Sequence, residues 1–132
     1  MNTEPLTITI EDHRAPSWNT LYSGKHWSVR SKTKNSIKML VRIALPDEVV
    51  DGDGHWFTEP VNITVEAHMK GRLIDADNVM DKYYIDALKD WVIPEDDKKF
   101  VNEVTTKCTR AKSDNVTITI APVEFVQAKE TA

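Results

Sequence analysis

The sequence predicts a single α+β domain in which a mixed four-stranded sheet carries two helices, in the order β-α-β-α-β-β. Four segments alternate apolar and polar residues, two longer segments repeat apolar residues at helical spacing, and 132 residues suffice for one domain of ordinary size. Hydrophobic residues make up 40% of the chain and charged residues 29%, which is typical of a globular protein. We therefore expect residues 1–132 to form one domain whose last residues, about 123–132, are a flexible tail.

Alternation predicts the four strands, because every second side chain of a strand points to the same face of the sheet. The apolar residues that share a face are Leu6, Ile8 and Ile10; Val61, Ile63, Val65, Ala67 and Met69; Phe100, Val104 and Cys108; and Val116, Ile118 and Ile120. Residues 111–115 are short enough to join the last two strands as a hairpin. With a helical layer on one face, the other face is covered, wetted or paired with a second subunit.

Helical spacing predicts a first helix over about residues 31–45 and a second over about residues 79–91. Pro46 ends the first helix and Pro94 ends the second. The apolar positions of the first helix are Ile37, Leu40, Val41, Ala44 and Leu45. An aromatic and basic loop and a polar connection are expected on either side of this helix, over residues 16–28 and 47–60.

Charge is distributed unevenly along the chain. The formal net charge is −4, yet residues 13–46 contain seven basic residues and no acidic one. Lys34, Lys38 and Arg42 are spaced by four residues and so lie on one face of the first helix. This stretch is either a surface that binds a polyanion or a solvated face. The aromatic residues interleaved with it either stack on bases or cap the hydrophobic core: Trp18, Tyr22 and Trp27.

Acidic residues gather where the second helix is expected to begin. Asp75 and Asp77 are two residues apart, so in an extended segment their carboxylates point to the same side. The pair Asp96-Asp97 follows beyond that helix. If the helix packs beside the acidic turn, three carboxylates converge and suit a hard cation such as Mg²⁺. The alternative is a set of helix caps and an exposed acidic turn.

Lys82 follows the acidic turn on the first turn or two of the second helix. It serves either as a structural counter-ion or as a positive charge that steadies a phosphorane-like transition state. Asp86 lies one helical turn further on, and we expect it to pair with Lys82.

Several classes of protein are excluded by the sequence. A calcium loop starting at Asp75 needs Asp or Asn at its fifth position and Gly at its sixth, where Val79 and Met80 stand. A single cysteine, Cys108, excludes a disulfide framework and a cysteine-built zinc site. No apolar run reaches the roughly 18 residues of a membrane helix, and residues 1–5 are too polar for a secretory signal. We expect a cytoplasmic protein with no membrane contact.

The residues of the acidic turn, the second helix and the early loop resemble those of the RusA family of crossover junction endodeoxyribonucleases, the small Holliday junction resolvases of phages and prophages. The resemblance is carried by Asp75-Ala76-Asp77-Asn78, Lys82, Asp86-Ala87-Leu88 and Val92-Ile93-Pro94-Glu95-Asp96-Asp97. A second part is the early loop, in which Pro16-Ser17-Trp18-Asn19 precedes His26-Trp27. The likeness covers most of residues 5–121 and includes the expected order of elements.

The resemblance implies a homodimer that binds four-way DNA junctions and cuts two strands symmetrically with Mg²⁺ or Mn²⁺. By position it makes Asp75, Asp77 and Asp97 the metal ligands, and Lys82 the catalytic lysine. We expect the DNA to be contacted by basic and aromatic residues of the early loop, the first helix and the turn after residue 69: His26, Trp27, Arg30, Lys32, Lys34, Lys38, Arg42, Lys70 and Arg72.

The chain departs from the family pattern at two positions. The lysine usually stands three residues after the Asn, but here Asp81 occupies that place and Lys82 follows. An extra residue inside the helix would rotate Lys82 by about 100°, whereas one in the preceding turn would leave it in place. Family members often have Arg before the first Asp, where this chain has Ile74, so Lys70 or Arg72 would have to contact the phosphate.

The expected function is therefore Mg²⁺-dependent resolution of four-way DNA junctions by paired symmetric cleavage. Two alternatives remain open on the sequence. One is a nuclease with the same site that acts on flaps or other branched DNA. The other is a non-catalytic DNA-binding or phage assembly module whose acids are only caps.

Overall fold

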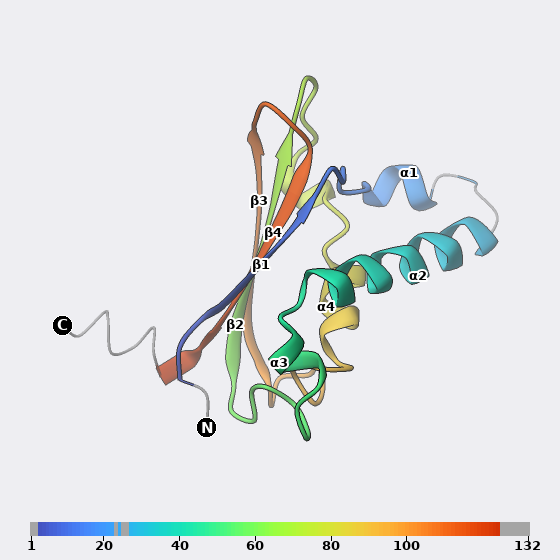
Figure 1. Ribbon diagram of the computed structural model, residues 1–132. Helices are drawn as coiled ribbons and strands as arrows, with labels where there is room; N and C mark the ends of the chain where they lie inside the picture. The colour runs from blue at the N-terminus through green and yellow to red at the C-terminus, as the bar shows by residue number, and fades with distance from the viewer. Residues whose placement is uncertain (1–2, 23, 25–26, 125–132) are drawn as a thin grey trace.

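The computed structural model describes residues 3–22, 24 and 27–124, and these form one sheet with helices on one side of it (Figure 1). The elements in chain order are β1 Leu6–Glu11, α1 Trp18–Tyr22, α2 Trp27–Ala44, α3 Asp47–Val50, β2 Val61–Met69, the 3₁₀ turn η1 Ala76–Asn78, α4 Lys82–Leu88, β3 Val101–Arg110 and β4 Asn115–Pro122. The predicted mixed four-stranded α+β fold is confirmed. No helix in the described ranges is both long and apolar enough to cross a membrane.

The strand order across the sheet is β1-β4-β2-β3. β4 pairs antiparallel with both β1 and β2, whereas β3 pairs parallel with β2. Two parallel neighbours cannot be joined by a tight turn, and the chain between β2 and β3 instead passes through η1 and α4. This crossover contains every acidic residue of the expected metal site.

The expected hairpin between the last two strands is wrong, because β2 lies between β3 and β4 in the sheet. The link from β3 to β4 passes over the end of β2, where the Ala111 amide donates to the Met69 carbonyl and the Lys70 amide donates to the Asp114 carboxylate. A short link is compatible with a hairpin, but here β2 competes successfully for pairing with both strands. Its core-facing residues are all buried, which favours a central position.

The two faces of the sheet differ in polarity. The apolar residues of β1, β2 and β4 point to the helices and are almost all buried. The opposite face carries mainly polar residues, with threonines opposite one another on neighbouring strands, such as Thr9 and Thr117 with their hydroxyl oxygens 3.3 Å apart. In the single chain this second face is therefore not covered by any described element.

The helices differ from the expected pattern in number and length. The one-turn helices α1 and α3 lie in segments expected to be loop and connection. α2 begins at Trp27, four residues earlier than expected, and buries Ile37 and Val41. α4 is shorter than expected, because residues 79 and 80 bond to the early loop: Val79 bridges to Ser17, and the Met80 amide donates to the Pro16 carbonyl.

A partly buried polar pair joins the segment after β1 to α4. The His13 Nε2 atom lies 2.6 Å from the Tyr84 hydroxyl oxygen, and Tyr84 is fully buried. Burial lowers the pKa of His13 from its ordinary value of 6.5, against a smaller opposing effect of the Asp114 carboxylate. Burial also raises the pKa of the Tyr84 hydroxyl.

We expect acid to destabilise the protein through His13. A histidine whose pKa is lowered on folding binds protons more readily in the unfolded chain, so its contribution to stability is present above about pH 6.5 and is lost as the pH falls toward the folded pKa. Urea unfolding at pH 7.5 and pH 5.5 measures this. The free energy of unfolding should fall more in the wild type than in His13→Gln, and equal losses in the two proteins would show that His13 is not responsible.

Candidate active site

The acidic turn follows the end of β2 and leads into α4. Asp75 is extended, with φ −67° and ψ 145°, and its carbonyl accepts a hydrogen bond from the Asn78 amide at 2.9 Å. Asp75 and Asp77 are both exposed. Within the described ranges, neither carboxylate has a hydrogen bond or an ion pair. The two acids therefore present free oxygen ligands at the surface.

The early loop is hydrogen-bonded directly to this turn. The Asn19 amide donates to the Asn78 side-chain oxygen at 3.1 Å across a separation of 59 residues. The Met80 amide donates to the Pro16 carbonyl at 2.9 Å, on the other side of Asn78. The two sequence segments that carry the family resemblance thus meet at one surface. Nothing in the local sequence marks Asn78 for this role, since a side chain that bonds to a distant amide leaves no periodic signal.

Arg14 fastens the chain on the other side of the acidic turn. Its guanidinium donates to the carbonyls of Lys70 and Arg72 and to the Asp114 carboxylate, the last at 3.2 Å. In the sequence Arg14 is only one of the seven basic residues of 13–46, because its partners lie 56 to 100 residues away. A pocket of about 370 Å³ next to the turn is lined by Arg14, Ala15, Pro16, Ser17, Thr20 and Ile74.

Asp97 lies just before the start of β3, away from the acidic turn. Its carbonyl accepts the Val101 amide at 2.8 Å, where β3 begins. The acidic turn is placed further along β3, because Asp81 accepts a hydrogen bond from Thr106 at 2.9 Å and Gly71 accepts one from Arg110 at 2.8 Å. The five residue steps from Val101 to Thr106 span about 16 Å of strand.

A single chain therefore does not bring Asp97 to Asp75 and Asp77. Within the part of the chain that is described, no group of three or more His, Cys, Asp or Glu side chains could hold a metal ion. The reason is the direction of α4, which starts beside the middle of β3 and leads toward the beginning of that strand. Asp96, next to Asp97, has its carboxylate 3.8 Å from the Lys89 ammonium.

Lys82 is the first residue of α4, and Asp81 immediately precedes the helix. Lys82 therefore stands at the start of the helix, after the turn that carries the acidic residues. The Lys82 ammonium lies 3.9 Å from the Asp86 carboxylate, which confirms the expected pairing. The Lys34 ammonium lies 3.7 Å from the same oxygen, and only 9% of the Asp86 side chain is exposed.

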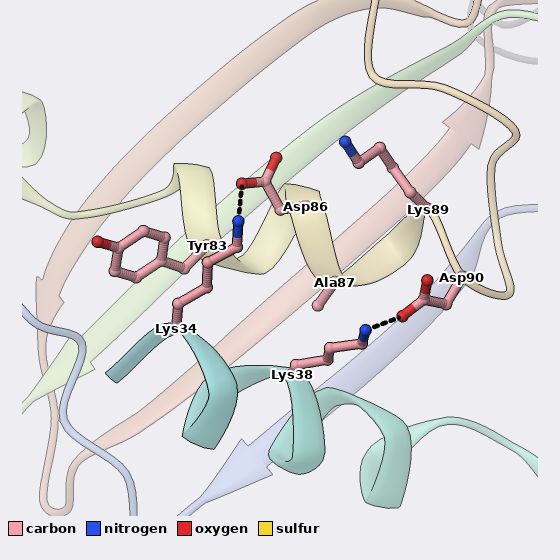
Figure 2. Close-up of a pocket in the computed structure, with 7 residues that line it drawn as sticks. All are labelled: Lys34, Lys38, Tyr83, Asp86, Ala87, Lys89 and Asp90. Atoms are coloured by element: carbon pink, nitrogen blue, oxygen red, sulfur yellow. Dashed lines mark ion pairs between the residues drawn. The ribbon is translucent and has the colours of Figure 1, made fainter. Parts of the chain in front are cut away.

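The basic face of α2 is partly neutralised by the segment that contains α4. Lys38 pairs with Asp90 at 2.8 Å, and Lys34 pairs with Asp86, across a shallow pocket of about 170 Å³ (Figure 2). The Lys38–Asp90 pair is exposed and contributes at most about 1 kcal/mol to stability, whereas the Asp86 carboxylate of the other pair is only 9% exposed. Both pairs reduce the positive charge that these two lysines offer to DNA. Lys32 and Arg42 are exposed and form no ion pair with any described residue.

Aromatic and basic side chains flank the start of α4. The Arg30 guanidinium lies 4.7 Å from the centre of the Tyr22 ring, in a cation–π contact. Burial, and then a hydrogen bond with Tyr22, raise the pKa of the Tyr83 hydroxyl. Trp18 packs against the core, as one of the two interpretations held, while Tyr22 is largely exposed.

The remaining expected DNA contacts are scattered. Trp27 begins α2 and is largely exposed. Lys70 and Arg72 lie in the exposed turn after β2, where their backbone carbonyls hold Arg14. His26 lies outside the described residues.

Comparison with known protein families and curated proteins found no relative of this chain: no protein-family model matches it, and no curated protein matches it either.

Proposed function

We propose that this protein is a Mg²⁺-dependent endonuclease that resolves four-way DNA junctions by paired symmetric cuts, in the cytoplasm of a bacterial or phage-infected cell. One observation carries the proposal: two exposed, unpartnered carboxylates, Asp75 and Asp77, stand on a turn that is hydrogen-bonded to the Pro16–Asn19 segment. The hydrogen bonds from this distant segment favour a functional acidic turn over the alternative in which the acids only cap helices. Indeed, neither Asp75 before η1 nor Asp81 before α4 makes a side-chain capping bond.

The donor set of the turn suits magnesium. Mg²⁺ prefers oxygen ligands, keeps several waters and is usually bound through one or two carboxylates together with substrate phosphates. Asp75 and Asp77 supply two such carboxylates, both accessible to a DNA backbone. Mn²⁺ has similar ligand preferences and should substitute. When bound, the ion supplies an activated water and stabilises the charge that develops on the phosphate.

The protein's own side chains have distinct tasks in this proposal. Asp75 and Asp77 would hold the ion, and Lys82 at the start of α4 would add positive charge for the scissile phosphate. Arg30, Lys32 and Arg42 supply phosphate contacts along α2, which provide affinity without reading sequence. Lys34 and Lys38 contribute less than their number suggests, because Asp86 and Asp90 neutralise them.

Asp97 joins this site from a second copy of the chain. In one protomer it lies at the beginning of β3, whereas the acidic turn lies toward the end of that strand. A twofold dimer in which the two β3 strands run in opposite directions brings Asp97 of each copy toward Asp75 and Asp77 of the other. A twofold dimer also matches the substrate, since productive resolution of a junction needs two equivalent strands to be cut.

A cleavage assay tests the function. The purified protein is incubated with labelled four-way junctions, flaps, forks and linear duplex, with Mg²⁺ and with EDTA. We expect paired nicks in the junction with Mg²⁺ and none with EDTA. Preferential cutting of flaps or forks would identify a different branched-DNA nuclease. Binding of the junction without any metal-dependent cleavage would favour the non-catalytic module.

Mixing two inactive variants tests whether Asp97 acts across the dimer. Asp75→Asn and Asp97→Asn chains are unfolded together, refolded together and assayed on the junction. If the site is shared, the heterodimer contains one intact site, and nicking of a single strand reappears. If each chain carries its whole site, the mixture stays as inactive as either variant alone. Asp96→Asn, assayed alone, is the matched control for the neighbouring acid and should retain paired cleavage.

A further inference from the structure

β3 is an open edge of the sheet. Among the described residues it pairs only with β2, and no strand lies beyond it. It is ten residues long, the longest of the described strands, and contains no proline. Its outer side presents unpaired backbone amides and carbonyls, and such an edge is a template for another strand. Val104, on the face of β3 that continues the core side of β2, is 42% exposed.

Symmetry limits how two copies of this edge can pair. In an antiparallel pair, residues directly opposite one another have their side chains on the same face. A twofold axis perpendicular to the sheet keeps each side chain on its own face, so opposed residues must both be odd-numbered or both even-numbered. The axis therefore passes through a residue of β3 and not between two residues.

We propose that two copies of this chain pair antiparallel along β3, with the twofold axis at Thr105. This register opposes Glu103 of each copy to Lys107 of the other, so one contact pattern creates two ion pairs. Both residues lie on the helix-free face, next to Asn62 and Glu66 of β2. Neither has an ion pair with any described residue of its own chain. The register pairs nine of the ten residues of β3.

The neighbouring registers lack this complementarity. An axis at Val104 opposes Glu103 to Thr105, and an axis at Thr106 opposes Lys107 to Thr105. On the face toward the helices, the Thr105 register sets Val104 against Thr106 of the other copy and so covers an exposed valine. Opposite charges directly across a pair of strands favour pairing, and like charges oppose it.

The other edge of the sheet offers no comparable pairing. β1 has six residues, and its only charged residue is Glu11. Two copies of β1 would bring acid but no base to the interface, so no register gains an ion pair. The sequence of β3 therefore provides opposite charges that favour pairing with a second copy, whereas the sequence of β1 does not.

The inference deepens the dimer of the proposed function but rests on β3 alone. Pairing along β3 joins the two sheets into one of eight strands, with the helices of both copies on the same side. It also sets the beginning of β3 in one copy beside the end of β3 in the other, which is the orientation that a shared acidic site requires.

Charge reversal tests the interface. Light scattering over a concentration series gives the dimer dissociation constant of the wild type, Glu103→Lys, Lys107→Glu and the double variant. Each single reversal should weaken the dimer about tenfold or more, because it replaces two attractive pairs with two repulsive ones. The double variant exchanges the charges and should recover wild-type affinity. Glu11→Lys on β1 is the matched control and should leave the constant unchanged.

Cross-linking tests the register. In a Cys108→Ser background, Thr105→Cys sets two thiols directly opposite one another, with Cβ atoms about 5 Å apart. Thr109→Cys, on the same strand and face, leaves its two thiols about 26 Å apart. Mild oxidation should therefore form a covalent dimer with the first variant and not with the second. A wild-type monomer at high micromolar concentration, or cross-linking at residue 109 in preference to 105, would overturn the proposal.

These measurements contain neither DNA nor metal. A monomer that cleaves junctions would defeat the interface and leave the nuclease standing, while a dimer of the stated register without cleavage would do the reverse.

Discussion

Asp75→Asn and Asp77→Asn are each expected to abolish Mg²⁺-dependent cleavage while leaving binding of the four-way junction intact or tighter. A metal site contributes several kcal/mol to transition-state stabilisation, so loss of one ligand should reduce the single-turnover cleavage rate by about 10²–10³-fold. Removal of a negative charge from a surface that meets DNA cannot weaken electrostatic binding. Single-turnover cleavage and gel-shift titration measure the two quantities.

Substitution of Asp75 or Asp77 should alter cleavage without altering the fold. Both are exposed and without a partner in the described ranges, so replacement by asparagine breaks no contact of the fold. Asp53→Asn, an exposed acid in the connection between α3 and β2, is the matched control and should retain full cleavage. Retained cleavage in Asp75→Asn and Asp77→Asn would remove the acidic turn from the mechanism.

Ile118→Ala is expected to destabilise the protein by about 2–5 kcal/mol, the usual cost of truncating a fully buried isoleucine. Ile118 lies in β4, between β1 and β2, and is 0% exposed. Its neighbour Thr119 points to the helix-free face. Thr119→Ala should therefore change the free energy of unfolding by no more than about 1 kcal/mol, since it loses only a cross-strand contact with Thr7.

Urea unfolding of the two variants measures how much each face of the sheet contributes to the free energy of unfolding. Adjacent residues of one strand should differ several-fold in their effect, because only one face of the sheet is packed against helices. If Thr119→Ala costs as much as Ile118→Ala, the threonine face is buried in solution, and a partner covers it.

The strands were predictable because burial imposes a period of two on the sequence. Val61 to Met69 alternate strictly, and the structure buries every second residue of β2. The body of α2 was predictable for the same reason, at a period near 3.6, and Ile37 and Val41 are indeed buried. The pairing of Lys82 with Asp86 followed from helical spacing alone.

Other features depended on contacts that no local pattern records. The start of α4 is set by bonds from residues 79 and 80 to the early loop, about 60 positions away. The expected hairpin failed because β2 pairs with both β3 and β4. Helical spacing placed Lys34 and Lys38 on one face of α2, but it did not show that they pair with acidic residues of the following crossover.

The amino-acid sequence by itself determined the four strands, the body of α2, the alternating burial of β2, and that Asp75 and Asp77 share one turn. Each of these follows from the spacing of neighbouring residues. The tertiary structure alone decided the strand order, the docking of the early loop on the acidic turn, and the separation of Asp97 from it. Those depend on the direction in which α4 crosses the sheet, which is set by packing between distant segments and so leaves no trace in local spacing.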